Sequence, residues 1–208
     1  AREMLSDSGG APTRQSVHYP LGPSLGQCCG GAVTLSFERL QPAQLAAWPD
    51  EAPRFHLQLY GAGHVARAIV YALLPLPFEI HWVETRDEML PEGPFLPHVV
   101  LHHTDDAAAE ARQAPAGACH LVMTHSHAID FDIVQAVLAR GDAGYCGLIG
   151  SATKRTTFER RLAARGIADD RIAAMVCPIG IADLPGKRPE VIAVAVAAQL
   201  LGWSLHDR

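Results

Sequence analysis

The segment 55–84 constrains the fold of this chain more than any other, because it places a glycine-rich turn between an apolar run and an amphipathic helix pattern. In that turn Gly61 permits a tight exit from a strand, and Gly63 lets the backbone approach a bound phosphate. The helix that follows offers free N–H groups and the positive end of its dipole to an anion. Glu84 ends the next apolar run, where such units keep a carboxylate for a ribose hydroxyl. We therefore expect a dinucleotide-type Rossmann unit, the alternative being a tight turn that holds no ligand.

The rest of the chain after Arg54 alternates between strand patterns and helix patterns. Such alternation favours an α/β fold, a Rossmann-like, mostly parallel sheet with helices on both faces. The expected strands are 55–60, 79–84, 97–102, 119–124 and 144–149, and the expected helices lie near 63–74, 105–113, 127–140, 151–165 and 189–201. The last helix is ambiguous because VIAVAVAA alternates as a strand does, but Pro189 at its start and its alanine content favour a helix.

Residues 1–50 differ from the rest, since they are rich in glycine and proline and contain a single strand-like run, 32–37. A piece of this kind cannot bury a core by itself. We expect it to be the remainder of a larger N-terminal domain. The segment 49–54 then serves as a linker, and residues 54–208 form the Rossmann-like domain.

Composition narrows the classes of partner. The formal net charge of −5, without a basic stripe, argues against nucleic acid. The longest apolar run, 191–198, is too short to cross a bilayer, and the N-terminus lacks the apolar stretch of a secretion signal. Five cysteines, an odd number, fit a reducing compartment. We therefore expect a cytoplasmic protein with no membrane contact.

The expected strand 119–124 runs into a histidine pair, His125 and His127, with Asp130 following. Ligands of open α/β sheets gather at the carboxyl ends of strands, so these side chains are candidates for ligand contact. Two alternatives remain open. Ser126 or Asp130 can cap the next helix, or the histidines and carboxylates can bind a divalent metal.

A second glycine turn, Gly147 to Ser151, follows the fifth expected strand and opens onto another helix. Gly150 and Ser151 resemble an anion cradle, and Lys154 supplies positive charge nearby. The spacing of a Walker loop is absent. The alternative is that Lys154 belongs to an ordinary solvated helix face.

Adjacent cysteines, Cys28 and Cys29, precede two glycines in the N-terminal segment. Neighbouring cysteines close a disulfide only with strain, and no second pair completes a zinc site. Exposed thiols in a glycine turn suit a soft metal or sulfur transfer, although they also suit simple packing of small residues. Cys119, Cys146 and Cys177 lie in or beside apolar runs, so we interpret them as core residues.

Five motifs occur in a characteristic order: GQCCGG, GAGHVA with WVETR, MTHSHAID, GLIGSATK with ERRLAARGI, and PIG followed by PEVIAVAVAAQLL. Taken together they resemble the xanthine dehydrogenase accessory protein (XdhC/CoxI) family over about residues 23–202. The resemblance implies a non-catalytic protein that binds molybdenum cofactor (molybdopterin). Such a protein protects the cofactor while its terminal sulfur is installed, and hands it to a xanthine dehydrogenase-type molybdenum hydroxylase. It also implies a cysteine desulfurase as a partner, and we expect a homo-oligomer.

Under this hypothesis the two glycine turns hold the pterin phosphate or its nucleotide, and Cys28 or Cys29 approaches the molybdenum. The expected cofactor-binding residues are Gly61, Gly63, His64, Val65, Glu84, Arg86, His125, His127, Gly150, Ser151 and Lys154. Two alternatives use the same edge of the sheet. The first alternative, an NAD(P)-dependent oxidoreductase, explains the first glycine turn equally well but assigns no function to the cysteine pair. The second, a metal hydrolase built on the histidine pair, lacks a further motif with metal-ligand spacing.

Overall fold

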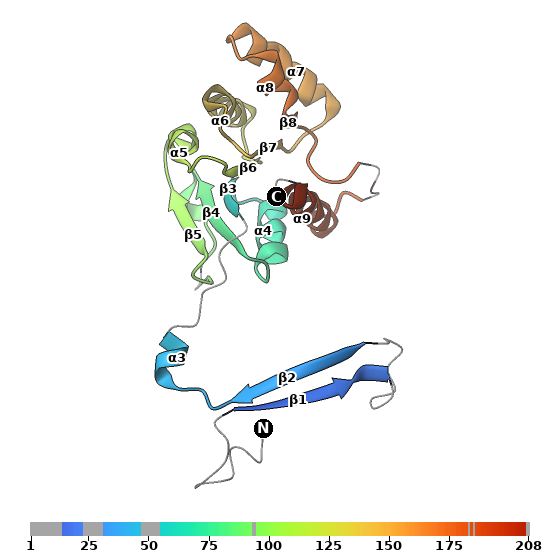
Figure 1. Ribbon diagram of the computed structural model, residues 1–208. Helices are drawn as coiled ribbons and strands as arrows, with labels where there is room; N and C mark the ends of the chain where they lie inside the picture. The colour runs from blue at the N-terminus through green and yellow to red at the C-terminus, as the bar shows by residue number, and fades with distance from the viewer. Residues whose placement is uncertain are drawn as a thin grey trace. The chain divides into compact units, whose positions relative to one another are not determined.

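A computed structural model describes residues 14–22, 31–46, 55–92, 95–182, 184 and 186–206. The chain divides into two compact units, Ala1–Asp50 and Glu51–Arg208 (Figure 1). That the first unit is the remainder of a larger domain stays a prediction.

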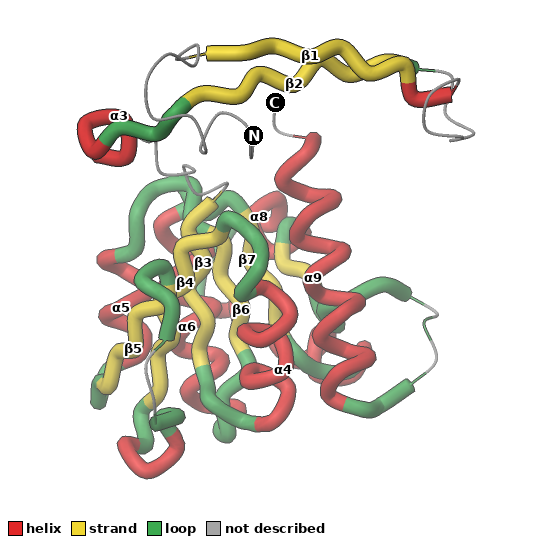
Figure 2. Tube along the Cα trace, turned by 90° about the horizontal axis from the view of Figure 1, so that it is seen from below, coloured by secondary structure: helices red, strands yellow, loops and turns green. Residues whose placement is uncertain are grey.

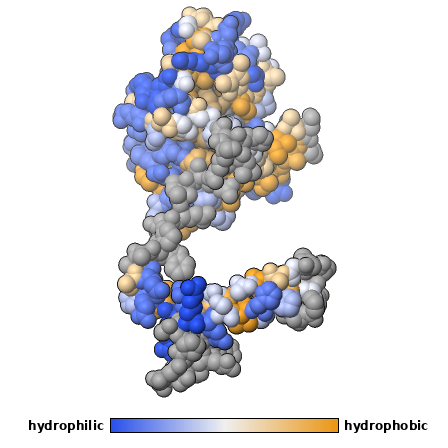
Figure 3. Space-filling view, in the orientation of Figure 1, coloured by the Kyte–Doolittle hydropathy of each residue, from blue (hydrophilic) through white to orange (hydrophobic). Residues whose placement is uncertain are grey.

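The first unit contains a two-stranded antiparallel ribbon. Strand β1 (Arg14–Pro20) pairs with β2 (Ala32–Glu38), and a short helix, α3 (Pro42–Ala46), follows. Cross-strand pairs join the hydroxyls of Ser16 and Ser36 at 2.8 Å and His18 Nδ1 to Thr34 Oγ1 at 3.0 Å. Most of its described side chains are exposed, and apolar and hydrophilic residues both lie along its surface (Figure 3). This hairpin therefore contributes no core of its own, because an isolated ribbon has no second layer to cover it.

The second unit is built on a six-stranded sheet in the order β5-β4-β3-β6-β7-β8, with every pair parallel. Its strands are β3 (Phe55–Tyr60), β4 (Phe78–Glu84), β5 (Val99–His103), β6 (Cys119–Val122), β7 (Tyr145–Leu148) and β8 (Met175–Val176). The chain starts in the middle at β3, moves outward to β5, and then returns to the other side of β3 at β6. Because the strand order reverses between β3 and β6, their carboxyl ends form the usual place for a ligand in an open α/β sheet.

Helices cover both faces of this sheet (Figures 1 and 2). One face packs against α4 (His64–Leu73) and α9 (Pro189–His206). The opposite face packs against α5 (Ala107–Gln113), α6 (His127–Arg140), α7 (Ala152–Ala164) and α8 (Asp169–Ala173). A short 3-10 turn, η1 (Asp87–Met89), follows β4. The predicted Rossmann-like fold is confirmed.

The ambiguous C-terminal segment is a helix. Its buried residues Ala193, Val196, Ala197 and Leu200 recur at helical spacing and pack with α4 and the sheet. Several details differ from the sequence prediction: the third strand begins at Val99, two residues later than expected, and β1, α3, α8 and the short strand β8 were not predicted. A two-residue strand carries no alternation to detect, and it exists only because β7 lies beside it.

The buried layers between sheet and helices are almost entirely apolar. Among the described residues the buried polar exceptions are Gln58, Glu84, His120 and Asp130. Burial of a polar group is costly unless it is hydrogen-bonded, so each of these side chains needs a partner. Glu84 and Asp130 lie at the carboxyl edge of the sheet, and their partners define the candidate site.

Candidate functional site at the carboxyl edge of the sheet

The first glycine turn connects β3 to α4, and its two glycines serve different purposes. Gly61 has a φ of +105°, and a Cβ there would lie 2.4 Å from the carbonyl oxygen of Met123. Gly63 has an ordinary φ of −71°, and a Cβ there would meet nothing within 4 Å. Gly61 is therefore required by the fold, whereas the space beside Gly63 is open to a ligand.

Gly63 is also the N-cap of α4 and provides no side-chain acceptor for the N–H groups of the first turn. The helices that follow β5, β6 and β7 at this edge are capped, α5 by Asp106, whose Oδ1 accepts the Ala109 N–H. Ser126 Oγ accepts from the Ala128 N–H at the start of α6, and Ser151 Oγ accepts from the Lys154 N–H at the start of α7. The N-terminus of α4 thus keeps more of its donor capacity for an external acceptor.

Glu84 lies at the end of the neighbouring strand, β4, and its carboxylate accepts hydrogen bonds that stabilise the first glycine turn. Its Oε2 accepts the Ala62 N–H at 2.7 Å, and its Oε1 accepts the N–H groups of Thr85 and Arg86 at 2.9 and 3.1 Å. The Arg86 guanidinium adds a bidentate pair, with both N–O distances 3.1 Å. Trp82, also in β4, donates its indole N–H to the Gly61 carbonyl at 2.8 Å.

The Glu84 carboxylate is ionised in this setting. Burial opposes its ionisation, but the hydrogen bonds from Arg86 and from the Ala62 N–H together outweigh burial and hold the pKa below its ordinary value. Both oxygens already have donors, so Glu84 has a structural role that the sequence did not reveal. Contact of Glu84 or Arg86 with a ribose stays a prediction, and the ribose hydroxyl would have to share an oxygen with these donors.

On the other side of β3, a buried ion pair joins α6, which follows β6, to α7, which follows the second glycine turn. Asp130, with 1% of its side chain exposed, lies 2.7 Å from Lys154 Nζ. The Thr124 N–H and hydroxyl also donate to Asp130, at 2.9 and 2.7 Å. Lys154 Nζ donates in addition to the Ile149 carbonyl at 2.9 Å. Lys154 is thus not a member of a solvated helix face, because its side chain is only 10% exposed.

Gly150 explains how Lys154 reaches this position. A Cβ on Gly150 would lie 2.7 Å from Cδ of Lys154, so the glycine makes room for the lysine stem to cross the turn. The ammonium group has three donors, and two of them are used by Asp130 and Ile149. One donor remains for an anion at the second glycine turn.

The histidine pair lies at the start of α6, with His125 and His127 both exposed. Asp130 faces Thr124 and Lys154, and among the described residues it does not converge with the two histidines as a metal-binding group. Ligand contact by His125 and His127 stays a prediction. The same holds for His64, which is exposed on the first turn of α4, and for half-buried Val65 beside it.

Two residues at this edge were missed by the sequence analysis. Thr124 donates its N–H and its hydroxyl to Asp130, and Arg67 donates to the carbonyls of Ala62 at 3.0 Å and Met89 at 2.5 Å. Arg67 lies on α4, three residues beyond the helix start. Its closeness in the sequence to the glycine turn was the signal that could have identified it. Cys28 and Cys29 lie outside the described residues, and their metal contact stays a prediction.

The three remaining cysteines, Cys119, Cys146 and Cys177, are buried thiols, as expected of core residues. Burial raises the pKa of the Cys146 thiol to about 12, so this thiol is neutral and unreactive at neutral pH. Burial also raises the pKa of Cys177, and there Lys154 and Arg155 act in the opposite direction.

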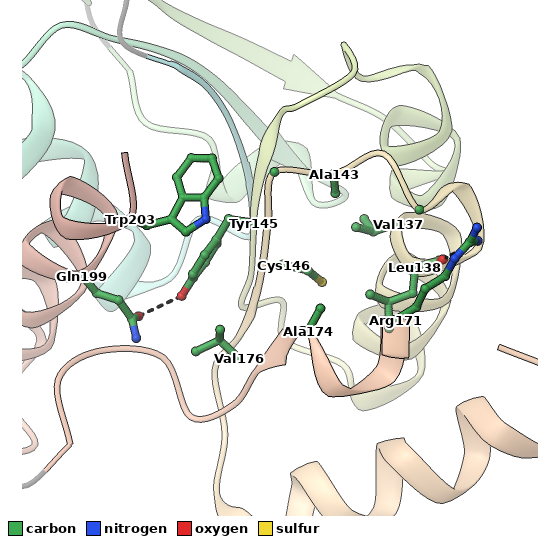
Figure 4. A pocket seen from close by; sticks show the side chains of 12 residues that line it. Val137, Leu138, Ala143, Tyr145, Cys146, Arg171, Ala174, Val176, Gln199 and Trp203 are labelled. Atoms are coloured by element: carbon green, nitrogen blue, oxygen red, sulfur yellow. Dashed lines mark hydrogen bonds between the residues drawn. The ribbon is translucent and has the colours of Figure 1, made fainter. Parts of the chain in front are cut away.

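A separate pocket of about 440 Å³ lies near the amino-terminal ends of β7 and β8 (Figure 4). Tyr145 in its wall donates its hydroxyl to Gln199 Oε1 at 2.8 Å, and Trp203 lies beside the tyrosine ring. Its lining is mainly apolar, with Arg171 at the rim. Because ligands of parallel sheets bind at the opposite ends of the strands, this pocket is not part of the candidate site.

The fold and this site define a Rossmann-like α/β protein with two glycine turns at the carboxyl edge of a parallel sheet, one left uncapped and one holding a buried lysine. Among the described residues, no helix is long and apolar enough to cross a membrane.

Residues 57–200 match the family described as the XdhC Rossmann domain, and the chain belongs to this family. The family predicted from the motifs is therefore confirmed. The chain is 27% identical over 180 residues to a protein of Escherichia coli (strain K12) described as "Uncharacterized protein YqeB". That match covers 86% of this chain and 30% of the E. coli protein, so this chain spans less than a third of that relative's length.

A solved structure, described as a xanthine dehydrogenase (BH1974) from Bacillus halodurans, is similar with a TM-score of 0.61. The sequences are 20% identical, and the match covers 94% of this chain and 61% of that chain. At this identity the similarity shows the shared fold.

Proposed function

We propose that this protein is an accessory factor that binds molybdenum cofactor at the carboxyl edge of its sheet and delivers it to a xanthine dehydrogenase-type hydroxylase. Family membership supports an accessory role of this kind. The observation that carries the binding proposal is the open space beside Gly63, at a helix N-terminus without a side-chain cap.

The residues at this edge fit a phosphate-bearing pterin. A phosphate at Gly63 would accept the N–H groups at the start of α4, and an anion at Gly150 and Ser151 would take the remaining donor of Lys154. Exposed His64, His125 and His127 surround this edge and supply further donors. When bound, the cofactor supplies the molybdenum centre that a hydroxylase uses.

In this proposal the chain holds and shields the cofactor, and the chemistry belongs to its partners. The terminal sulfur would come from a cysteine desulfurase, with Cys28 or Cys29 as the soft ligand near the molybdenum. A homo-oligomer belongs to the same proposal.

The direct test is calorimetric titration of the chain with molybdopterin. Gly63→Val should abolish binding and leave the fold intact, because a Cβ at this position meets no protein atom within 4 Å and the added side chain occupies the space proposed for the ligand. Gly202→Val is the matched control, since a Cβ at Gly202 also meets nothing within 4 Å and this glycine lies near the end of α9. Equal affinity of the Gly63→Val variant and the wild type would contradict the site.

Lys154→Ala should weaken binding by about 1.5–3 kcal/mol, the range of a charge-assisted hydrogen bond, with a dependence on salt. Because Lys154 also holds Asp130, this comparison needs equal folded fractions of variant and wild type. Titration with NADP and NAD tests the alternative of an NAD(P)-dependent oxidoreductase. Binding of these nucleotides without any binding of molybdopterin would favour that alternative.

The cysteine pair is tested by cofactor transfer. Replacing Cys28 and Cys29 with serine should leave phosphate binding intact but end productive transfer, because a hydroxyl lacks the softness and the low pKa of a thiol. The assay reconstitutes an apo molybdenum hydroxylase with cofactor loaded on either protein. Equal hydroxylase activity with the wild type and with the double variant would contradict a metal-binding role and would indicate that the cysteines serve only in packing.

A further inference from the structure

A group of titratable side chains lies away from the glycine turns, at the amino-terminal half of β3 and β4. His56 and Glu79 are register partners on β3 and β4, and His81 lies two residues further along β4 on the same face. One ligand atom from each of these three residues lies within 4.8 Å of the other two. We propose that His56, Glu79 and His81 form a binding site for a divalent transition metal of the zinc class.

The distances agree with such a site. Glu79 Oε1 lies 3.2 Å from His81 Nε2, and Glu79 Oε2 lies 3.6 Å from His56 Nδ1. Neighbouring ligand atoms of a tetrahedral zinc ion are about 3.3 Å apart, given zinc–nitrogen and zinc–oxygen bonds of about 2.0–2.1 Å. The ion therefore requires only small side-chain movements. Two imidazoles and one carboxylate leave a fourth position open, as in zinc sites that bind water or a small ligand.

The ring nitrogens that face away from the proposed ion already have partners. His81 Nδ1 lies 2.9 Å from His102 Nε2, and His56 Nε2 lies 3.0 Å from the Gln58 side-chain amide. Outer hydrogen bonds of this kind orient metal-bound histidines and fix which nitrogen carries the proton. With zinc on His81 Nε2, the Nδ1–H donates to His102.

Gln58 provides an independent indication. It is only 4% exposed, and its Oε1 has no hydrogen-bond partner while its NH₂ group faces His56 Nε2. A metal on His56 Nδ1 moves the imidazole proton to Nε2. A half-turn of the amide then places Oε1 where it accepts that proton, so the oxygen gains a donor while the NH₂ group moves to the position that Oε1 held.

The site is reachable from solvent and is built on strands. The side chains of His56, His81 and Glu79 are 14%, 22% and 44% exposed. The rings of His56 and His81 lie with centroids 4.2 Å apart, which holds both near Glu79. Side chains on paired strands are positioned more precisely than side chains on loops, so the cost of ordering them on metal binding is small.

The test is equilibrium dialysis of the chelator-treated full chain against zinc, with wild type, His81→Ala, Glu79→Gln and His102→Ala. Wild type should bind one equivalent. Each substitution should weaken binding at least about ten-fold, and His102→Ala by about 10–100-fold, the range for an outer-shell partner. Glu79→Gln is the variant least expected to unfold the chain, because it keeps the shape of the side chain and Glu79 is 44% exposed. His103→Ala, an exposed neighbour outside the group, is the matched control.

Substitution of Cys28 and Cys29 with serine separates this site from a thiolate site. The double variant should keep its bound zinc, and cobalt bound in its place should show no thiolate charge-transfer absorption. Absence of zinc binding by the wild type would overturn the proposal. So would unchanged binding in His81→Ala and Glu79→Gln, or loss of binding in the cysteine variant alone.

Discussion

Replacement of Lys154 by methionine tests the buried ion pair most directly. Methionine keeps much of the length of the lysine stem but removes the ammonium group 2.7 Å from Asp130. The Asp130 carboxylate, 1% exposed, then remains charged or must take up a proton away from solvent. We expect the free energy of unfolding to fall, because an unpaired buried charge costs more than the pair contributes.

The magnitude follows from the partners that remain. Loss of one member of a buried pair costs about 3–5 kcal/mol. Thr124 still donates two hydrogen bonds to Asp130, which places the expected loss near the lower end, at about 3 kcal/mol. The double variant Lys154→Met with Asp130→Asn removes the charge and keeps an acceptor for Thr124. It should recover about 2 kcal/mol of the loss.

The assay is urea unfolding followed by far-UV circular dichroism and tryptophan fluorescence, for which Trp82 is a buried probe. Arg112→Met is the control. It breaks the Arg112–Asp106 pair at 3.0 Å, whose side chains are 55% and 60% exposed, and should cost less than about 1 kcal/mol. A loss in Lys154→Met no larger than in the control, or no recovery in the double variant, would refute the reasoning.

Three further predictions concern stability. Gly61→Ala should lower the free energy of unfolding by more than about 2 kcal/mol in urea titrations, because its φ is +105° and the Met123 carbonyl blocks a Cβ; a loss comparable to that of an exposed surface change would contradict this. His120 is 2% exposed, and burial lowers its pKa to about 4. The stability that neutral His120 contributes to the folded state is therefore complete above pH 6.5 and is lost as the pH falls towards 4. The expected loss is about 3 kcal/mol relative to His120→Gln, measured by unfolding at each pH; parallel pH profiles would count against it. Glu84→Gln should cost about 2–4 kcal/mol in thermal melts, because the amide places an NH₂ group against existing donors, and an unchanged melting temperature would exclude the structural role of the Glu84 hydrogen bonds.

Local chemistry made much of the fold predictable from the sequence. The glycine turn after β3, the serine caps of α6 and α7 and the alternation of strand and helix patterns depend on neighbours within a few residues. The predicted ranges therefore match the observed elements closely, with 55–60 reproduced as Phe55–Tyr60. The family followed from motifs of the same local kind.

The pairings at the two proposed sites were decided by tertiary structure. Lys154 meets Asp130 across 24 positions, and the register of β3 with β4 brings His56 beside Glu79 across 23. A sequence pattern shows that such residues are polar and where each strand ends. It does not show which of them meet, because that depends on strand order, on register and on which side chains the helices bury. The sequence by itself thus determined most of the elements and the edge at which we propose a ligand site, whereas the contacts that fix each side chain came from the packing of distant segments.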